Sequence, residues 1–111
     1  MTTMTFSTVT EQFNASVPGT DAFLRVKESM PTLMKSDPSH AAAYFLVYGF
    51  ARSYVILHDD EGITMEVAEM AKNQLLGYMR AVEQALPGGA EALLAAMNEI
   101  VVHYDANKQL F

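Results

Sequence analysis

The sequence lacks cysteine and tryptophan, and it is poor in basic residues. Without cysteine, neither a disulfide nor a thiolate metal cluster can form, and this composition suits a reducing compartment. Its 7 Lys and Arg stand against 13 Asp and Glu, which gives a net charge of −6 over 111 residues. Such an acidic balance disfavours binding to nucleic acid, because that binding depends on cations that displace counterions from phosphates. We therefore expect an acidic, cytoplasmic protein without a nucleic-acid partner.

Signals for secretion or membrane insertion are also scarce. The first six residues carry no positive charge and no long apolar run, so they do not read as a secretory signal. The most apolar segment, residues 41–57, only just reaches the length that spans a bilayer. Arg52 lies within it, and a charged side chain inside a membrane is costly. We expect a buried helix of a soluble protein and no membrane partner.

Helix-forming residues dominate what remains. Half of the chain is hydrophobic, mostly Ala, Leu, Met and Val, and 8 residues are Met. No segment alternates polar and apolar residues for long enough to predict a strand. A chain of 111 residues is about the size of one domain. The sequence therefore predicts a single all-α domain over residues 1–111.

Turn signals divide this domain into helices. Residues 1–19 predict a short N-terminal helix or arm, residues 20–105 a bundle and residues 106–111 a tail. The third helix should start at Asp37 and Pro38, since Asp is a good N-cap and Pro has the right φ for the first helical turn. Short connections make neighbouring helices antiparallel. We therefore predict an up-and-down four-helix bundle with an additional short N-terminal helix. The breaks are Pro18-Gly19, Ser36-Asp37-Pro38, Gly62 and Pro87-Gly88-Gly89.

The third helix, residues 38–58, is apolar on nearly every side. Its only polar stripe is formed by Arg52 and Asp59 beside Tyr48. A helix of this kind should be surrounded by protein. Either the N-terminal helix or a second copy of the chain could cover it. We expect a homodimer, because large exposed apolar patches are unusual on monomers.

One group of side chains could bind a divalent metal. The ends of the third and fifth helices should lie near each other, which would bring His58 and Asp59 close to Glu99 and His103. Imidazoles and carboxylates ligate zinc, manganese and iron. A structural explanation competes: His58 suits the negative end of a helix dipole, and Glu99 and His103 fall on the polar side of their helix. We favour the structural explanation.

Two further pairs of residues could recognise a ligand or a partner. Arg52, assisted by Tyr48, could anchor a small carboxylate or phosphate, although pairing with a neighbouring acid is the simpler role for a cation on an apolar helix. Met65 and Met70 lie at the edges of the apolar side of their helix, and flexible thioethers suit recognition surfaces.

No familiar catalytic motif occurs in the sequence, and no motif identifies a family. We expect no cofactor. The leading hypothesis is a non-enzymatic helical protein that acts through protein–protein interaction. The alternative is a small metal- or ligand-binding bundle with a site near His58 and His103.

Overall fold

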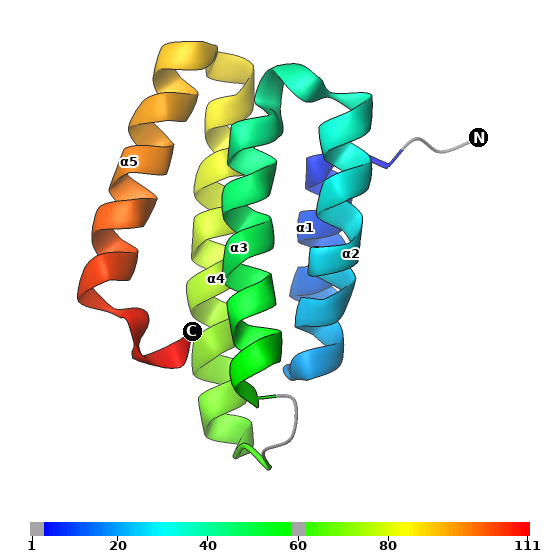
Figure 1. Cartoon of the computed structure of the whole chain (residues 1–111), viewed down its shortest axis with the longest axis vertical. Coiled ribbons are helices and arrows are strands. Elements are labelled where there is room, and N and C mark those ends of the chain that lie inside the picture. Colours follow the sequence, from blue (N-terminus) through cyan, green and yellow to red (C-terminus); the bar gives the residue numbers. More distant parts are fainter. Residues whose placement is uncertain (1–3, 59–61) are drawn as a thin grey trace.

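The computed structural model describes residues 4–58 and 62–111, which form five α-helices joined by short connections (Figure 1). The all-α prediction is confirmed, and the described residues contain no strand. The helices are α1 (Phe6–Ala15), α2 (Thr20–Ser36), α3 (Ala41–His58), α4 (Met65–Ala85) and α5 (Ala90–Ala106). Short 3₁₀ turns precede α3 (Pro38–His40), follow α4 (Leu86–Gly88) and follow α5 (Lys108–Leu110).

The helices run alternately down and up and form two layers (Figure 1). Helices α2 and α3 form the front layer, with α1 and α4 behind them, and α5 lies at one edge. Each of α1 to α4 packs against its neighbours in a closed ring, whereas α5 packs against α4 and α3. The molecule measures 39 × 37 × 20 Å. Its thickness is about two helix diameters, so every helix has an outer side.

Local signals explain where the helices start. The N–H of Val67 donates to Thr64 Oγ1 at 3.2 Å, so Thr64 caps the start of α4. The cap of α1 is Thr5, whose hydroxyl accepts from the N–H of Thr8 at 3.2 Å. Helix α2 follows Gly19, whose φ of +147° strains any residue with a side chain. Pro31 lies inside α2, and the helix continues through it to Ser36.

The Asp37 carboxylate fixes the connection between α2 and α3. It accepts hydrogen bonds from Ser39 Oγ at 3.0 Å and Tyr44 Oη at 2.6 Å, and His40 Nδ1 lies 2.7 Å from it. It makes no hydrogen bond to the helix amides, so its role differs from the predicted cap. The hydrogen bonds with Tyr44 and His40 lower the pKa of Asp37 to about 2. Burial and the contact with Asp37 raise the pKa of Tyr44.

Aromatic side chains dominate the core between the layers. Phe23 of α2 and Tyr54 of α3 are stacked, with ring centroids 3.7 Å apart. Phe111 is only 7% exposed and lies against Phe23, Phe50 and Tyr54. The end of the chain therefore contributes to the core: α5 continues to Ala106, and Phe111 fills space between α2, α3 and α5.

Two cations of α4 hold α1 in place. Lys72 Nζ donates to the carbonyl oxygens of Asn14 at 2.8 Å and Ser16 at 2.6 Å. The last carbonyls of a helix have no partner within it, so Lys72 satisfies groups that would otherwise need water. Arg80 pairs with Glu11 of α1 and with Glu83 of its own helix. Helix α1 is thereby fixed in the rear layer beside α4.

None of the helices in the described residues has the length and apolar character needed to cross a membrane.

Replacing Phe111 with Ala should lower the free energy of unfolding by about 3 kcal/mol, because a buried aromatic ring is removed and a cavity remains. Urea denaturation measures this loss. The control is Val102→Ala, since Val102 is 72% exposed and its truncation should cost less than about 0.5 kcal/mol. Equal losses in the two variants would show that Phe111 does not pack in the core.

Replacing Asp37 with Asn should lower stability at neutral pH. The pKa of Asp37 is lowered from 3.8 to about 2 in the folded protein. Its stabilising contribution is therefore fully present above pH ~4 and is lost as the pH falls towards ~2. Thermal unfolding midpoints of both proteins between pH 7 and pH 2 should converge in that window. Asp105→Asn, at a well-exposed carboxylate, is the control and should change little. A gap between wild type and Asp37→Asn that stays constant with pH would refute the assignment.

Candidate functional site

The outer side of α3 carries a stripe of mostly apolar side chains. Phe45, Gly49, Arg52 and Ile56 follow one another at steps of four, three and four residues, which places them on one side of a helix. Phe45 and Ile56 each expose 62% of their surface. The opposite side of α3 contains its buried residues, namely Ala43, Tyr44, Val47, Phe50, Ala51 and Tyr54.

The prediction that this helix is surrounded by protein on nearly every side was therefore wrong for the single chain. Helix α1 does not cover the stripe, because it packs against α2 and α4 in the layer behind (Figure 1). Helix α3 is apolar on both sides, as the sequence predicts. A molecule two layers thick nevertheless encloses only the inner side of α3, so the outer side stays exposed.

A shallow groove of about 280 Å³ separates α3 from α5. The ring centroids of Phe50 and Tyr104 lie 4.9 Å apart, so these side chains close the space between the two helices. Serine and glycine in the lining keep the groove open beside Phe45. The lining residues are Phe45, Leu46, Gly49, Phe50, Ser53 and Tyr104.

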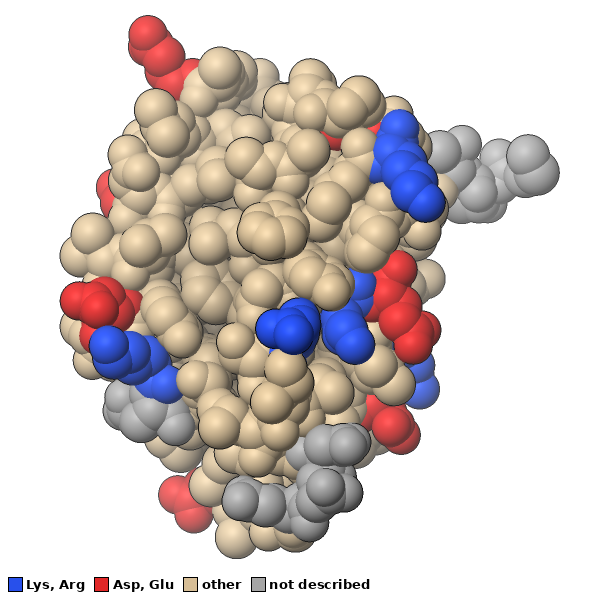
Figure 2. Space-filling model, viewed as in Figure 1, with Lys and Arg blue, Asp and Glu red and all other residues tan. Residues whose placement is uncertain are grey.

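Helix α5 extends the apolar surface beyond this groove. Only Leu93 and Ile100 of this helix are fully buried, because an edge helix packs on one side alone. Leu94 and Val101 are 59% and 48% exposed and lie two turns apart on one side of α5. Figure 2 shows this face of the molecule, which is largely uncharged over the upper part of α3 and α5 and has cationic side chains near its centre. We call the outer stripe of α3 together with this side of α5 the front face.

Gly49 lies at the middle of α3 and has no packing role inside the chain. A Cβ added there would come within 4 Å of no other described atom outside its own helix backbone and chain neighbours. Glycine inside a helix costs about 1 kcal/mol relative to alanine. Gly77 of α4 meets the same open space, so packing within the described chain explains neither of these helical glycines.

Arg52 and Tyr48, the predicted ligand-binding pair, both lie at the front face. Arg52 is exposed and makes no ion pair with any described residue, so the expected salt bridge with a neighbouring helix is not formed there. Tyr48 is half-buried, and its ring stacks on Phe45 with centroids 5.9 Å apart. Ligand binding by this pair stays a prediction.

The four residues of the predicted metal site have different surroundings. Asp59 lies outside the described residues. The ring of His58 packs against Tyr54, with centroids 4.6 Å apart, whereas the ring of His103 lies 5.5 Å from Tyr78. Glu99 and His103 are exposed and line one groove between α4 and α5. Among the described residues, no three His, Asp or Glu side chains form a group that could hold a metal.

That second groove, of about 630 Å³, contains a hydrogen-bond chain that the sequence did not reveal. Gln74 Nε2 donates to Tyr78 Oη at 2.7 Å and to the carbonyl of Asn107 at 3.1 Å. Tyr78 Oη lies 2.8 Å from His103 Nδ1. The hydroxyl already accepts from Gln74, so its own proton is free for His103, which favours the imidazole with its proton on Nε2. Burial raises the pKa of Tyr78.

The hydrogen bonds among Gln74, Tyr78 and His103 fasten the end of α5 to α4. The only sequence signal for it is the spacing of four residues between Gln74 and Tyr78 and between His103 and Asn107. His103, proposed from sequence as a metal ligand, is thus a partner of Tyr78 on the neighbouring helix.

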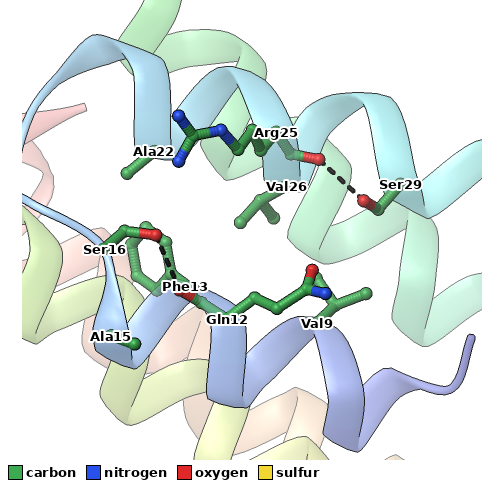
Figure 3. Close-up of a pocket in the computed structure, with 9 residues that line it drawn as sticks. All are labelled: Val9, Gln12, Phe13, Ala15, Ser16, Ala22, Arg25, Val26 and Ser29. Carbon is green, nitrogen blue, oxygen red and sulfur yellow. Dashed lines mark hydrogen bonds between the residues drawn. The ribbon is translucent and has the colours of Figure 1, made fainter.

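A third groove, of about 510 Å³, lies between α1 and α2 (Figure 3). Val26 points into the space between the two helices, and Arg25 and Gln12 lie on its two sides. Ser16 Oγ donates to the Gln12 carbonyl at 2.6 Å, and Ser29 Oγ donates to the Arg25 carbonyl at 2.8 Å. Both hydroxyls are thus used within their own helix or at its end, which leaves Arg25 and Gln12 as the polar side chains free to meet a ligand.

Met65 and Met70 are 55% and 51% exposed, as expected for edge positions. Their positions differ by five, so they point about 140° apart around α4 and do not form one surface. Both lie on the rear layer, outside the front face.

No family model matches the chain, and no curated protein or solved structure shows significant similarity to it.

In dilute solution, where the chain is expected to be monomeric, Gly49→Ala should raise the free energy of unfolding by about 0.5–1 kcal/mol through helix propensity. Gly77→Ala is the matched control, because Gly77 also lies inside a helix with open space around it. Chemical denaturation at low protein concentration compares the two. A loss of stability in Gly49→Ala alone would mean that its site is closed within the monomer.

Proposed function

We propose that this protein is non-enzymatic and acts through protein–protein contact, and that its contact surface is the front face, with a second copy of the chain as partner. The observation that carries the proposal is the exposure of Phe45 and Ile56 at 62% each beside a groove that continues onto α5. Contiguous apolar surface rimmed by polar residues is typical of protein-binding sites.

The energy of such a contact comes from apolar burial. Removing a large apolar side chain from water contributes about 1.5–3 kcal/mol when burial is complete. The front face offers four exposed large side chains, and a symmetric contact uses each of them twice. They are Phe45, Ile56, Leu94 and Val101. These side chains are only 48–62% exposed before contact, so each contributes about half of the full value, and the total is of the order of the free-energy cost of lost translational and rotational freedom on association.

The charge distribution supports self-association. Two copies that each carry a net charge of −6 repel one another, so their contact must exclude carboxylates. The described stripe on α3 contains no acidic residue, and its only charge is Arg52. The front face is thus where two such chains can approach with the least repulsion.

Phe45→Glu should abolish self-association, because each copy would then place a carboxylate in an apolar contact. Sedimentation velocity and light scattering over a range of concentrations measure the assembly. The matched control is Val102→Glu, which introduces the same charge on α5 away from the front face and should leave the assembly intact. Circular dichroism checks that both variants keep their helices. A wild-type chain that stays monomeric at every concentration would refute the proposal.

A further inference from the structure

The outer stripe of α3 has a symmetry that bears on how two copies would meet. Counting equally in both directions from Gly49 pairs Phe45 with Ser53, and Ala42 with Ile56. In each pair one side chain is large and the other is small, and Gly49 pairs with itself. All five positions lie on or beside the exposed side of α3: Ala42, Phe45 and Ile56 are exposed, and Gly49 and Ser53 are half-buried. The stripe is therefore complementary to a reversed copy of itself.

We propose that two chains pack α3 against α3 in antiparallel orientation, about a two-fold axis that passes beside Gly49. This inference rests on the proposed self-association and specifies its geometry. A two-fold contact matches residue i of one copy with residue j of the other, and j with i. Phe45 of each copy then fills the space above Ser53 of the other, and Ile56 fills the space above Ala42. Gly49 lets the two backbones approach closely, which accounts for a glycine that the single chain does not need.

The same arrangement supplies a partner for Arg52. Counting three residues from Gly49 in each direction sets Arg52 of one copy opposite Leu46 of the other, at the level between Phe45 and Tyr48 of that copy. Those two rings are stacked on each other and lie at the surface. A guanidinium over aromatic rings is a favourable cation–π contact. Arg52, which makes no ion pair with a described residue, would thus meet the Phe45–Tyr48 pair across the axis.

A parallel two-fold pairing is much poorer. It would place Phe45 opposite Phe45, Ile56 opposite Ile56 and Arg52 opposite Arg52. Large side chains would then collide while Gly49 would face an empty space, and two like charges would meet in an apolar contact. The antiparallel arrangement has a further advantage. Its two-fold axis lies in the contact plane at right angles to α3, so the α5 helices of the two copies lie on the same side of the paired α3 helices. The exposed sides of both α5 helices, with Leu94 and Val101, then face each other (Figure 1).

Disulfide trapping tests this geometry directly, because the chain has no cysteine and an introduced thiol is the only one present. Gly49→Cys should form a covalent dimer on mild oxidation, since facing Cα atoms near the axis of two closely packed helices lie within disulfide range. Ile56→Cys is the matched control on the same stripe. Position 56 lies seven residues from the axis in each copy, so the two thiols of an Ile56→Cys dimer would be about 21 Å apart along the helices. This variant should therefore not cross-link.

The outcomes separate the two proposals. A dimer in which Ile56→Cys cross-links as well as or better than Gly49→Cys would overturn the antiparallel axis while leaving self-association intact. A chain that is monomeric without oxidant, and in which neither variant cross-links, would overturn both. Efficient cross-linking of Gly49→Cys alone supports both.

A second pair of variants avoids reliance on the thiol. Gly49→Leu adds bulk where the backbones would touch and should raise the dissociation constant of the dimer about tenfold or more. Gly77→Leu makes the same change on α4, where an added Cβ also comes within 4 Å of no described atom outside its own helix backbone and chain neighbours, and should leave the dissociation constant unchanged. Both should unfold at or above the wild-type temperature as monomers. Equal dissociation constants for wild type and Gly49→Leu would overturn the proposed axis.

Discussion

The organisation of this protein depends on the limited enclosure that two layers of helices provide. At a thickness of 20 Å, the molecule has one internal layer of side chains, and each helix can bury only the side that faces it. Aromatic stacking fills that layer, with Phe23 against Tyr54 at 3.7 Å and Phe111 beside them. Helix α3 is rich in apolar residues on both sides, so its outer half stays exposed once the inner half is packed.

Polar contacts act mainly at the margins of this core. Lys72 and Arg80 fasten α1 to α4, and Asp37 holds the turn that leads into α3. Gln74, Tyr78 and His103 join α5 to α4. Each of these contacts satisfies groups at the end of a helix or links neighbouring helices. Several side chains that could in principle bind a metal or a ligand therefore stabilise the fold instead. The front face is different, because its apolar side chains and Arg52 serve no such purpose within the described chain.

A contact between copies would bury the exposed apolar side chains of the front face, as the core buries those of the inner side of α3. Large side chains would meet small ones on either side of Gly49, and close packing would fill the contact as it fills the core. It would also explain why an acidic chain keeps carboxylates off the described stripe of α3. The assembly would then be a continuation of helix packing in a third and a fourth layer, with α3 as the innermost element. A helix that is apolar all round would thus have its natural place at the centre of the dimer.

Helical spacing, caps and breaks in the sequence determined the all-α class and the approximate limits of all five helices, because these signals act within a few residues. The exposure of Met65 and Met70 and the polar side of α5 followed from the same periodicity. Only the tertiary structure decided that α1 packs against α2 and α4 in the rear layer rather than over the outer side of α3, that Phe111 enters the core and that His103 meets Tyr78. These outcomes depend on which helix sides meet, and apolar periodicity alone leaves that choice open when a helix has two apolar sides.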